Sequence, residues 1–210
     1  MAILVHSTTS VEDKNRWGTT WDCFDDGQAL YGRPFKLDVC AEPATAKVNR
    51  FYTSIEWLEL RAGSFEQRGI GFCGEDFNPQ ANIVGFDALN LHWENDFWCN
   101  PPFDLKQLFI KKAFSEARAG NSGMMLLPYE PATGWWRELV DGKATAIYEP
   151  DGRYNFYDID GVTKKTGVNF PSAFVLWTPH FTHYTPKIPF NRGVADELGI
   201  NFRMRLGEAA

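Results

Sequence analysis

Asn100-Pro101-Pro102-Phe103 is the stretch of the sequence best suited to chemistry on a flat amine. It follows the apolar segment FWC, and two consecutive prolines can neither continue a sheet nor fill a helix interior, so we predict a rigid loop after a strand. The side-chain oxygen of Asn100 and the carbonyl of Pro101 could accept hydrogen bonds from an exocyclic amine and turn its lone pair toward an electrophile. Phe103 offers a face on which a base could stack. A purely structural turn is the alternative.

Two carboxylates stand near other predicted strand ends. Asp38 interrupts the apolar run FKLDVCA, where it could organise a loop for the polar end of a nucleotide-like ligand or be a buried acid satisfied by backbone N–H groups. Asp87 could accept a hydrogen bond from an adenine amino group, although a turn or helix N-cap aspartate is the commoner interpretation. The glycine-rich turn typical of nucleotide sites is missing, because CAEP from Cys40 stands in its place.

Alternating strands and helices are expected to position these groups. Apolar segments at 35–41, 97–99 and 124–127 predict strands, and amphipathic segments at about 21–30, 104–119 and 135–140 predict helices. The pattern indicates an α/β fold, a mainly parallel sheet with helices on both faces. The segments 144–148 and 173–177 predict an antiparallel hairpin near the C-terminus. Ligands of such sheets bind at the carboxyl ends of the strands.

Two details of the helices are also predicted. In the first helix we expect three apolar residues to face inward and three polar ones to face outward, respectively Trp21, Phe24 and Leu30, and Asp25, Asp26 and Gln28. In the second, Asp104 and Gln107 have the spacing of a capping box.

The 210 residues suffice for one domain with a large core, and 44% hydrophobic and 15% aromatic residues exclude a disordered chain. We predict a flexible N-terminus over 1–16, a main domain over 17–178 with an insert at about 57–85, and a loop-rich tail over 179–210. The net charge of −6 disfavours a nucleic-acid partner but does not exclude a local basic face.

Several kinds of protein are disfavoured by the remaining signals. The cysteines at 23, 40, 73 and 99 form no CxxC pair and fit reduced thiols in a cytoplasmic protein. His180 and His183 have an HxxH spacing without neighbouring ligands, so we predict no metal site. No apolar run approaches a membrane span and the N-terminus lacks a secretory pattern, so we predict no membrane partner.

In this order, the pieces resemble the phage-type DNA N-6-adenine methyltransferase family. LDVCA followed at a distance by CNPPF is quite specific to that family, whereas NPPF alone is shared with other amino-methyltransferases. The likeness covers most of the chain from Trp17 to Trp177. The matching stretches are the Thr19-Thr20 turn, LDVCAEPATAK from Leu37, RFYT from Arg50, DAL from Asp87, WCNPPF from Trp98, MMLLP from Met124, and GRYNF through NFPSAFVLW from Gly152 to Trp177.

The resemblance implies a Rossmann-like class I methyltransferase fold, S-adenosyl-L-methionine as cofactor, and N6 of adenine in double-stranded DNA as the methylated group. It implies action in the host cytoplasm if a phage encodes the chain. It also implies residue roles: a catalytic loop at Asn100, Pro101, Pro102 and Phe103; a cofactor methionine loop at Asp38, Val39, Cys40 and Ala41; a cofactor adenine contact at Asp87 and Ala88; and an N-terminal element at Thr19 and Trp21 that closes over the methionine end.

The sequence departs from the family pattern in two places, and alternatives stay open. Thr20 stands where the family usually has proline, and the stretch between Thr53 and Asp87 is longer than usual. The same loop could serve cytosine N4, an RNA base or a protein glutamine, and the fold could also belong to a non-catalytic DNA-binding module. The sequence indicates no oligomeric state. Four basic residues could meet phosphates, although a solvated face is commoner for each: Lys143, Arg153, Lys164 and Lys165.

Overall fold

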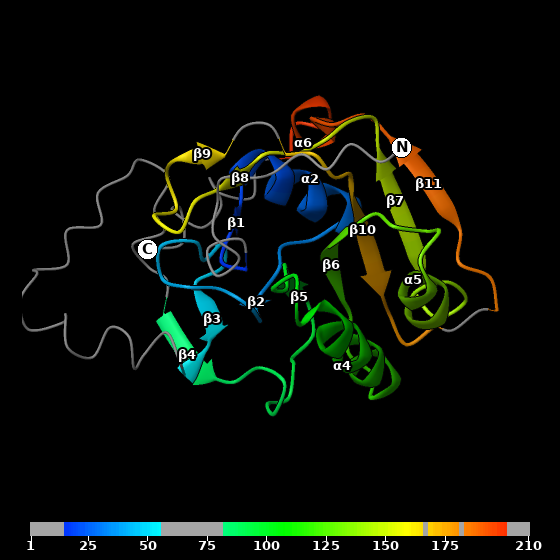
Figure 1. Cartoon of the computed structure of the whole chain (residues 1–210), viewed down its shortest axis with the longest axis horizontal. Coiled ribbons are helices and arrows are strands. Elements are labelled where there is room, and N and C mark those ends of the chain that lie inside the picture. Colours follow the sequence, from blue (N-terminus) through cyan, green and yellow to red (C-terminus); the bar gives the residue numbers. More distant parts are fainter. Residues whose placement is uncertain (1–14, 56–81, 166–167, 181–182, 201–210) are drawn as a thin grey trace, which may run out of the picture.

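An eight-stranded sheet is the centre of the computed structural model, which describes residues 15–55, 82–165, 168–180 and 183–200 (Figure 1). Its strand order is β11-β7-β10-β6-β5-β2-β3-β4. The five strands from β4 to β6 in this order run parallel, β10 is antiparallel to both its neighbours, and β11 is parallel to β7. The strands are β2 (Leu37–Asp38), β3 (Arg50–Thr53), β4 (Asn82–Phe86), β5 (Phe97–Cys99), β6 (Gly123–Pro128), β7 (Ala146–Pro150), β10 (Ser172–Trp177) and β11 (Lys187–Phe190).

Helices cover both faces of this sheet, as Figure 1 shows. The helices α2 (Trp21–Tyr31) and α6 (Val194–Glu197) lie on one face, and α4 (Lys106–Arg118) and α5 (Gly134–Leu139) lie on the other. Because side chains alternate along a strand, Trp98 packs into the core under α2 while Phe97 and Cys99 pack against α4. The predicted α/β fold is confirmed, and so is the antiparallel pairing of the segments now seen as β7 and β10.

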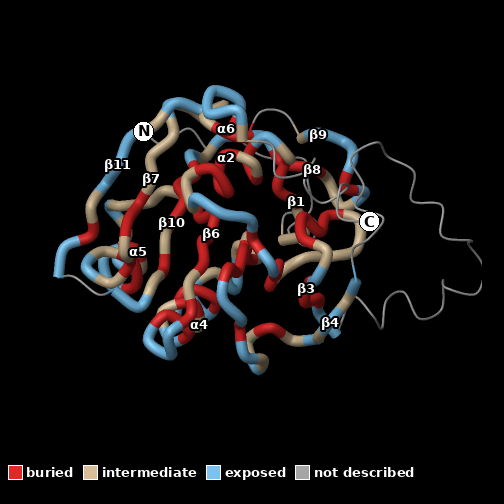
Figure 2. Tube along the Cα trace, turned by 180° about the vertical axis from the view of Figure 1, so that it is seen from behind, coloured by how far each residue is buried: buried red, intermediate tan, exposed pale blue. Residues whose placement is uncertain are grey.

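Burial follows this layered arrangement. In Figure 2 the central strand β6 is buried along its whole length, whereas the edge strand β11 is mostly exposed. A parallel strand covered on both faces reads as a continuous apolar run, which explains why β6 was recognisable from its sequence alone. No helix within the described ranges combines the length and apolar character that crossing a bilayer requires.

The strand order reverses between β2 and β5. From β2 the chain proceeds to β3 and β4 on one side, and β5 then returns to pair with β2 on the other side. At such a reversal the connections leave in opposite directions and open a crevice at the carboxyl ends of the two strands. Asp38 ends β2 and Asn100 directly follows β5, so both residues lie at this crevice.

A small antiparallel sheet lies beside the crevice. It consists of β1 (Gly18–Thr19), β8 (Phe156–Tyr157) and β9 (Lys164–Lys165) in the order β1-β8-β9. Gly18 is opposite Tyr157 and Thr19 is opposite Phe156. This pairing holds residues 15–19, which we call the N-terminal strap, against a segment about 140 residues later in the chain.

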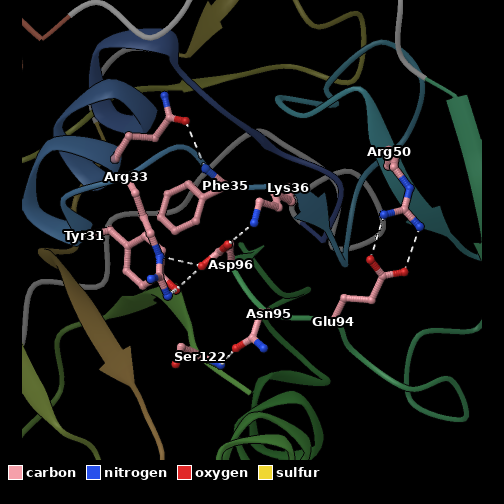
Figure 3. A network of polar contacts seen from close by, with 10 residues as sticks. Tyr31, Arg33, Phe35, Lys36, Arg50, Glu94, Asn95, Asp96 and Ser122 are labelled. Carbon is pink, nitrogen blue, oxygen red and sulfur yellow. Dashed lines mark hydrogen bonds and ion pairs between the residues drawn. The ribbon is translucent and has the colours of Figure 1, made fainter. Parts of the chain in front are cut away.

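At the amino ends of the central strands, away from the crevice, Asp96 joins the starts of β2 and β5 (Figure 3). Its buried carboxylate contacts Arg33 Nε at 2.6 Å, Lys36 Nζ at 2.7 Å and the hydroxyl of Tyr31 at 2.8 Å. Burial alone would raise the pKa of Asp96, but the contacts with Lys36, Tyr31 and Arg33 outweigh it and hold the pKa below its usual range. Both strands that lead to the crevice are therefore fixed at their starting ends.

Two predictions about the helices were wrong. Asp26 and Gln28 of α2 are both buried. The Asp26 carboxylate accepts hydrogen bonds from the hydroxyl of Tyr154 and from backbone N–H groups at the start of α6, and Gln28 Oε1 accepts one from the backbone N–H of Phe35. A later part of the chain thus covers a face that its polar residues suggested was exposed. Helix α4 has Leu105 at its N-cap without a side-chain cap, and Asp104 pairs with Asn15 instead.

The structure differs from the loop-rich tail expected after residue 178. Residues 187–190 add β11 to the sheet, and residues 194–197 form α6 against α2. Pro189 lies in β11, and an edge strand tolerates proline because one side of its backbone makes no ladder hydrogen bonds. Residues 1–14 of the expected flexible N-terminus and 57–81 of the expected insert lie outside the described residues, and residues 82–85 belong to β4.

Candidate active site

A cavity of about 560 Å³ occupies the crevice at the carboxyl ends of β2, β3 and β5. The N-terminal strap forms part of its wall. Most of the residues proposed from the sequence line it, although they come from four separate segments of the chain. They are Thr19, Asp38, Val39, Cys40, Ala41, Asp87, Ala88, Asn100 and Pro102.

Trp21, Pro101 and Phe103 are not among the lining residues. The ring of Trp21 lies under the ammonium group of Lys47 at 4.5 Å. Pro101 is buried in the loop. The ring of Phe103 meets the rings of Trp17 and Phe170 edge to face, with centroids 6.3 and 5.1 Å away.

The cavity also contains residues that sequence reasoning missed. One group belongs to the strap, and its contacts depend on pairing between distant segments, which leaves no local signal. Another group follows β3, where the rule that ligands bind at strand ends could have found it. The missed lining residues are Asn15, Arg16, Trp17, Gly18, Glu42, Thr45, Tyr52, Thr53, Ser54, Ile55, Leu89, Trp98, Leu105 and Phe109.

The orientation of the Asn100 side chain is fixed by the strap. Its Nδ2 donates a hydrogen bond to the carbonyl of Trp17 at 3.1 Å. Because only the amide nitrogen can donate to a carbonyl, this contact also identifies Oδ1, which accepts no hydrogen bond from any residue that the structure describes. The carbonyl of Pro101 likewise has no donor among the described residues. Two acceptors on one rigid loop are thus available to a donor from outside the protein.

Asp38 organises the loop of residues 38–47, which we call the Asp38 loop. Its carboxylate is 2% exposed and accepts hydrogen bonds from the backbone N–H of Cys40 at 3.2 Å and of Lys47 at 3.3 Å. Burial raises the pKa of Asp38 to about 6, and the two hydrogen bonds and the charge of Lys47 limit the rise. The carboxylate therefore serves both interpretations, as a buried acid with backbone partners and as the organiser of a cavity loop.

Lys47 anchors the far end of the same loop. Its side chain is buried, its ammonium donates to the carbonyl of Thr45 at 3.1 Å, and it lies over the rings of Trp21 and Tyr157 at 4.5 and 5.1 Å. Cation–π contacts of a desolvated ammonium are stronger than exposed ones. Trp21 thus supports the cavity from behind the Asp38 loop.

Asp87 adopts a left-handed backbone conformation with φ of 60°. Its N–H donates to the carbonyl of Thr53 at 3.0 Å, and its Oδ2 accepts from Asn90 at 2.5 Å. Aspartate tolerates this conformation better than most residues, and such backbone is concentrated at functional sites. Asp87 therefore builds a turn and also lines the cavity.

Two buried polar atoms of the cavity wall have no hydrogen-bond partner among the residues that the structure describes. They are Oγ1 of Thr53, a residue only 4% exposed, and Nε1 of Trp17. Buried polar groups are almost always paired, so an orphan in a cavity wall is what a polar ligand would satisfy. Both atoms thus point to a ligand with hydrogen-bonding groups.

The basic residues considered for phosphate contacts do not form one patch. Lys143 bonds to the carbonyl of Glu138 at the end of α5, whereas Lys164 and Lys165 form β9, which lies far from α5 in Figure 1. Lys165 pairs with Asp158 at 2.6 Å, and Arg153 and Lys164 are exposed. His180 and His183 are exposed as well, and no three His, Cys, Asp or Glu side chains gather as metal ligands within the described ranges.

Comparisons with known proteins identify relatives of this chain. A model of the DNA N-6-adenine-methyltransferase (Dam) family matches residues 83–193. A DNA N-6-adenine-methyltransferase of Haemophilus phage HP1 is 24% identical over 179 residues, which are 84% of this chain and 86% of that protein. One of Escherichia phage T1 is 27% identical over 101 residues, 45% of this chain and 40% of that protein.

A solved structure from Listeria monocytogenes, assigned as a class I S-adenosylmethionine-dependent methyltransferase, aligns with 97% of this chain and 72% of its own. Its sequence identity is 10% and the TM-score is 0.47. This similarity is too weak to support a conclusion.

Proposed function

Because the chain belongs to the DNA N-6-adenine-methyltransferase (Dam) family, we propose that its cavity binds S-adenosyl-L-methionine and that its proline loop, residues 100–104, acts on adenine N6 in double-stranded DNA. The sheet described above is its Rossmann-like class I methyltransferase fold. The observation that carries the proposal is Asn100, a residue of the cavity wall whose Nδ2 is bonded to the carbonyl of Trp17 and whose Oδ1 has no partner among the described residues.

The cavity suits the cofactor in size and in the order of its polar groups. Small-molecule sites commonly occupy about 300–1,000 Å³, and this cavity has about 560 Å³. Following the strand order β5-β2-β3-β4, the polar groups are Asn100, Asp38, Thr53 and Asp87. Asp38 and its loop would hold the methionine end, Thr53 the ribose, and Asp87 with Ala88 the adenine.

The proline loop would then prepare the amine for transfer. The bound cofactor supplies an electrophilic methyl group on a sulfonium. Asn100 Oδ1 accepts one N–H of the adenine amine and the carbonyl of Pro101 accepts the other, which draws the nitrogen out of conjugation and directs its lone pair at the methyl group. N6 would receive the methyl carbon of the cofactor, which leaves as a neutral thioether, and the proton that N6 releases would pass to solvent. Phe103, a member of this loop, is half-buried, and its stacking on an extruded base is part of the proposal.

Incubation of the full chain with labelled S-adenosylmethionine and unmethylated double-stranded DNA tests this function. We expect the label in N6-methyladenine after enzymatic digestion and mass analysis of the nucleosides. Label in N4-methylcytosine, RNA or protein glutamine would show that this group is the acceptor instead of adenine. No label from a folded protein that binds cofactor would favour a non-catalytic module. The phage relatives support the cytoplasm of an infected cell as the place of action.

Thr53 provides a prediction that does not require activity. Thr53→Val removes the unpaired hydroxyl with little change in shape, so we expect S-adenosylhomocysteine to bind about 5- to 10-fold more weakly, as loss of one hydrogen bond implies. Isothermal titration calorimetry with ribose-deoxy analogues checks the assignment, because the variant should no longer distinguish them from the parent ligand. Thr185→Val is the matched control, since Thr185 is buried and bonded to Ala144 away from the cavity. A variant that keeps the full discrimination would rule out the ribose contact.

A further inference from the structure

The N-terminal strap runs along the proline loop and holds it at both ends. At one end, Asn100 Nδ2 donates to the carbonyl of Trp17 at 3.1 Å. At the other, Asn15 Nδ2 donates to Asp104 Oδ2 at 2.8 Å, and the backbone N–H of Asp104 donates to Asn15 Oδ1 at 3.2 Å. Between them, the ring of Trp17 meets the ring of Phe103 edge to face. Segments more than 80 residues apart in sequence are thus joined.

The strap has its own anchors, independent of the proline loop. Arg16 forms two hydrogen bonds to the carboxylate of Glu42, at 2.5 and 2.7 Å, and a paired guanidinium and carboxylate is a directional contact. Gly18 pairs with Tyr157 in the small sheet and lies so close to Thr45 that a Cβ would come within 2.6 Å of its methyl group. The strap is therefore fixed to the Asp38 loop on one side and to β8 on the other.

We propose that Asn15 and Trp17 are positioning residues that keep the amide of Asn100 in the orientation needed for reaction. An asparagine amide can rotate by half a turn about its last torsion and exchange its oxygen and nitrogen. In the exchanged orientation Nδ2 would face the amine, and two donors repel. The carbonyl of Trp17 can pair only with Nδ2, so it selects the orientation with Oδ1 toward the cavity, and Asn15 keeps the loop in register with it. The inference rests on the role proposed above for Asn100.

Exchanging the residue types of Asn15 and Asp104 tests this while leaving Asn100 and Trp17 unchanged. Asn15→Asp places two carboxylates at hydrogen-bond distance, so the strap and the loop repel each other. Adding Asp104→Asn restores one amide, one carboxylate and an acceptor for the backbone N–H of residue 104. We expect Asn15→Asp to lower kcat about 10-fold, in line with the loss of one exposed hydrogen bond and a new repulsion, while the double variant returns to within about 3-fold of wild type.

Binding and structure must be followed beside turnover. The melting temperature should stay near wild type in all variants, and the affinity for S-adenosylhomocysteine should change less than kcat does, although Asn15 lines the cavity. Asn95→Asp is the matched control: Asn95 makes a similar exposed contact, to the N–H of Ser122, at the opposite edge of the sheet, and kcat should not change. Unchanged turnover in Asn15→Asp, or a double variant no faster than Asn15→Asp, overturns the proposal.

Nuclear magnetic resonance separates this inference from the proposed function. The side-chain amide protons of Asn100 should exchange slowly with solvent in the wild type, faster in Asn15→Asp, and slowly again in the double variant. If the three proteins show this pattern but the wild type methylates no DNA, the proposed function is refuted and the positioning role of the strap is retained. Equal exchange in all three proteins would refute the positioning role of the strap even if the enzyme is active.

Discussion

Replacing Asn100 with alanine will lower turnover by about 100- to 1,000-fold and leave cofactor affinity nearly unchanged. The magnitude is that seen when one preorganised polar group is removed from a charge-developing centre. The affinity is spared because the Asp38 loop and Thr53 lie on other strands of the cavity wall. Single-turnover rates on unmethylated DNA measure the first effect, and calorimetry with S-adenosylhomocysteine measures the second. Equal losses in both quantities would show that Asn100 binds the cofactor instead.

Asn100→Asp separates the contribution of the side-chain oxygen, which accepts from the amine, from that of the side-chain nitrogen, which donates to Trp17. The carboxylate keeps an acceptor toward the amine but loses the donor to the carbonyl of Trp17, so two oxygens now face each other. We expect turnover between those of the wild type and the alanine variant. A turnover equal to that of Asn100→Ala would mean that the contact with Trp17 is needed as much as the acceptor itself.

The parts of this protein that were predictable are those whose signal is local. Strands β5 and β6 are apolar runs closed by prolines, and the proline loop follows directly from its own residue types. Asp38 and Asn100 could be placed at one edge because carboxyl ends of parallel strands meet there. These inferences require nothing from distant parts of the chain.

The parts that were not predictable depend on contacts between distant segments. Asp26 was expected at the surface because no local feature indicates that Tyr154 and the start of α6 will cover it. The strap has no local signal either, since the roles of Asn15 and Trp17 exist only when they meet the proline loop. Polarity describes a residue, whereas burial describes a tertiary arrangement.

Cofactor affinity will fall as the pH drops below about 6, and Asp38 is the cause. Burial raises the pKa of Asp38 to about 6, so the carboxylate is charged above that pH and neutral below it. The neutral form accepts weaker hydrogen bonds from Cys40 and Lys47, and it no longer attracts the ammonium group at the methionine end of the ligand. The loss should approach a factor of about ten per pH unit, the limit for one proton. Calorimetry between pH 5 and 8 with S-adenosylhomocysteine measures it.

Protonation of Asp38 should weaken ligand binding but stabilise the folded state. An unfolded aspartate has a pKa of about 4, and because the folded value is higher, protonation favours the folded state. The contribution of Asp38 to stability is therefore greatest below about pH 4, decreases as the pH rises to about 6, and is constant above it. Ligand affinity should rise over a pH range in which this contribution falls, which a general acid denaturation could not produce.

Asp38→Ala should weaken S-adenosylhomocysteine binding about 10- to 100-fold at pH 7.5, because two backbone N–H groups lose a charged acceptor. The pH dependence of binding should disappear in the same variant, since the titrating group is gone. Partial unfolding would lower affinity at every pH by a similar factor, whereas loss of the carboxylate narrows the gap between variant and wild type as the pH falls. A variant that keeps the wild-type pH profile would show that another group titrates, and would remove Asp38 from the binding site.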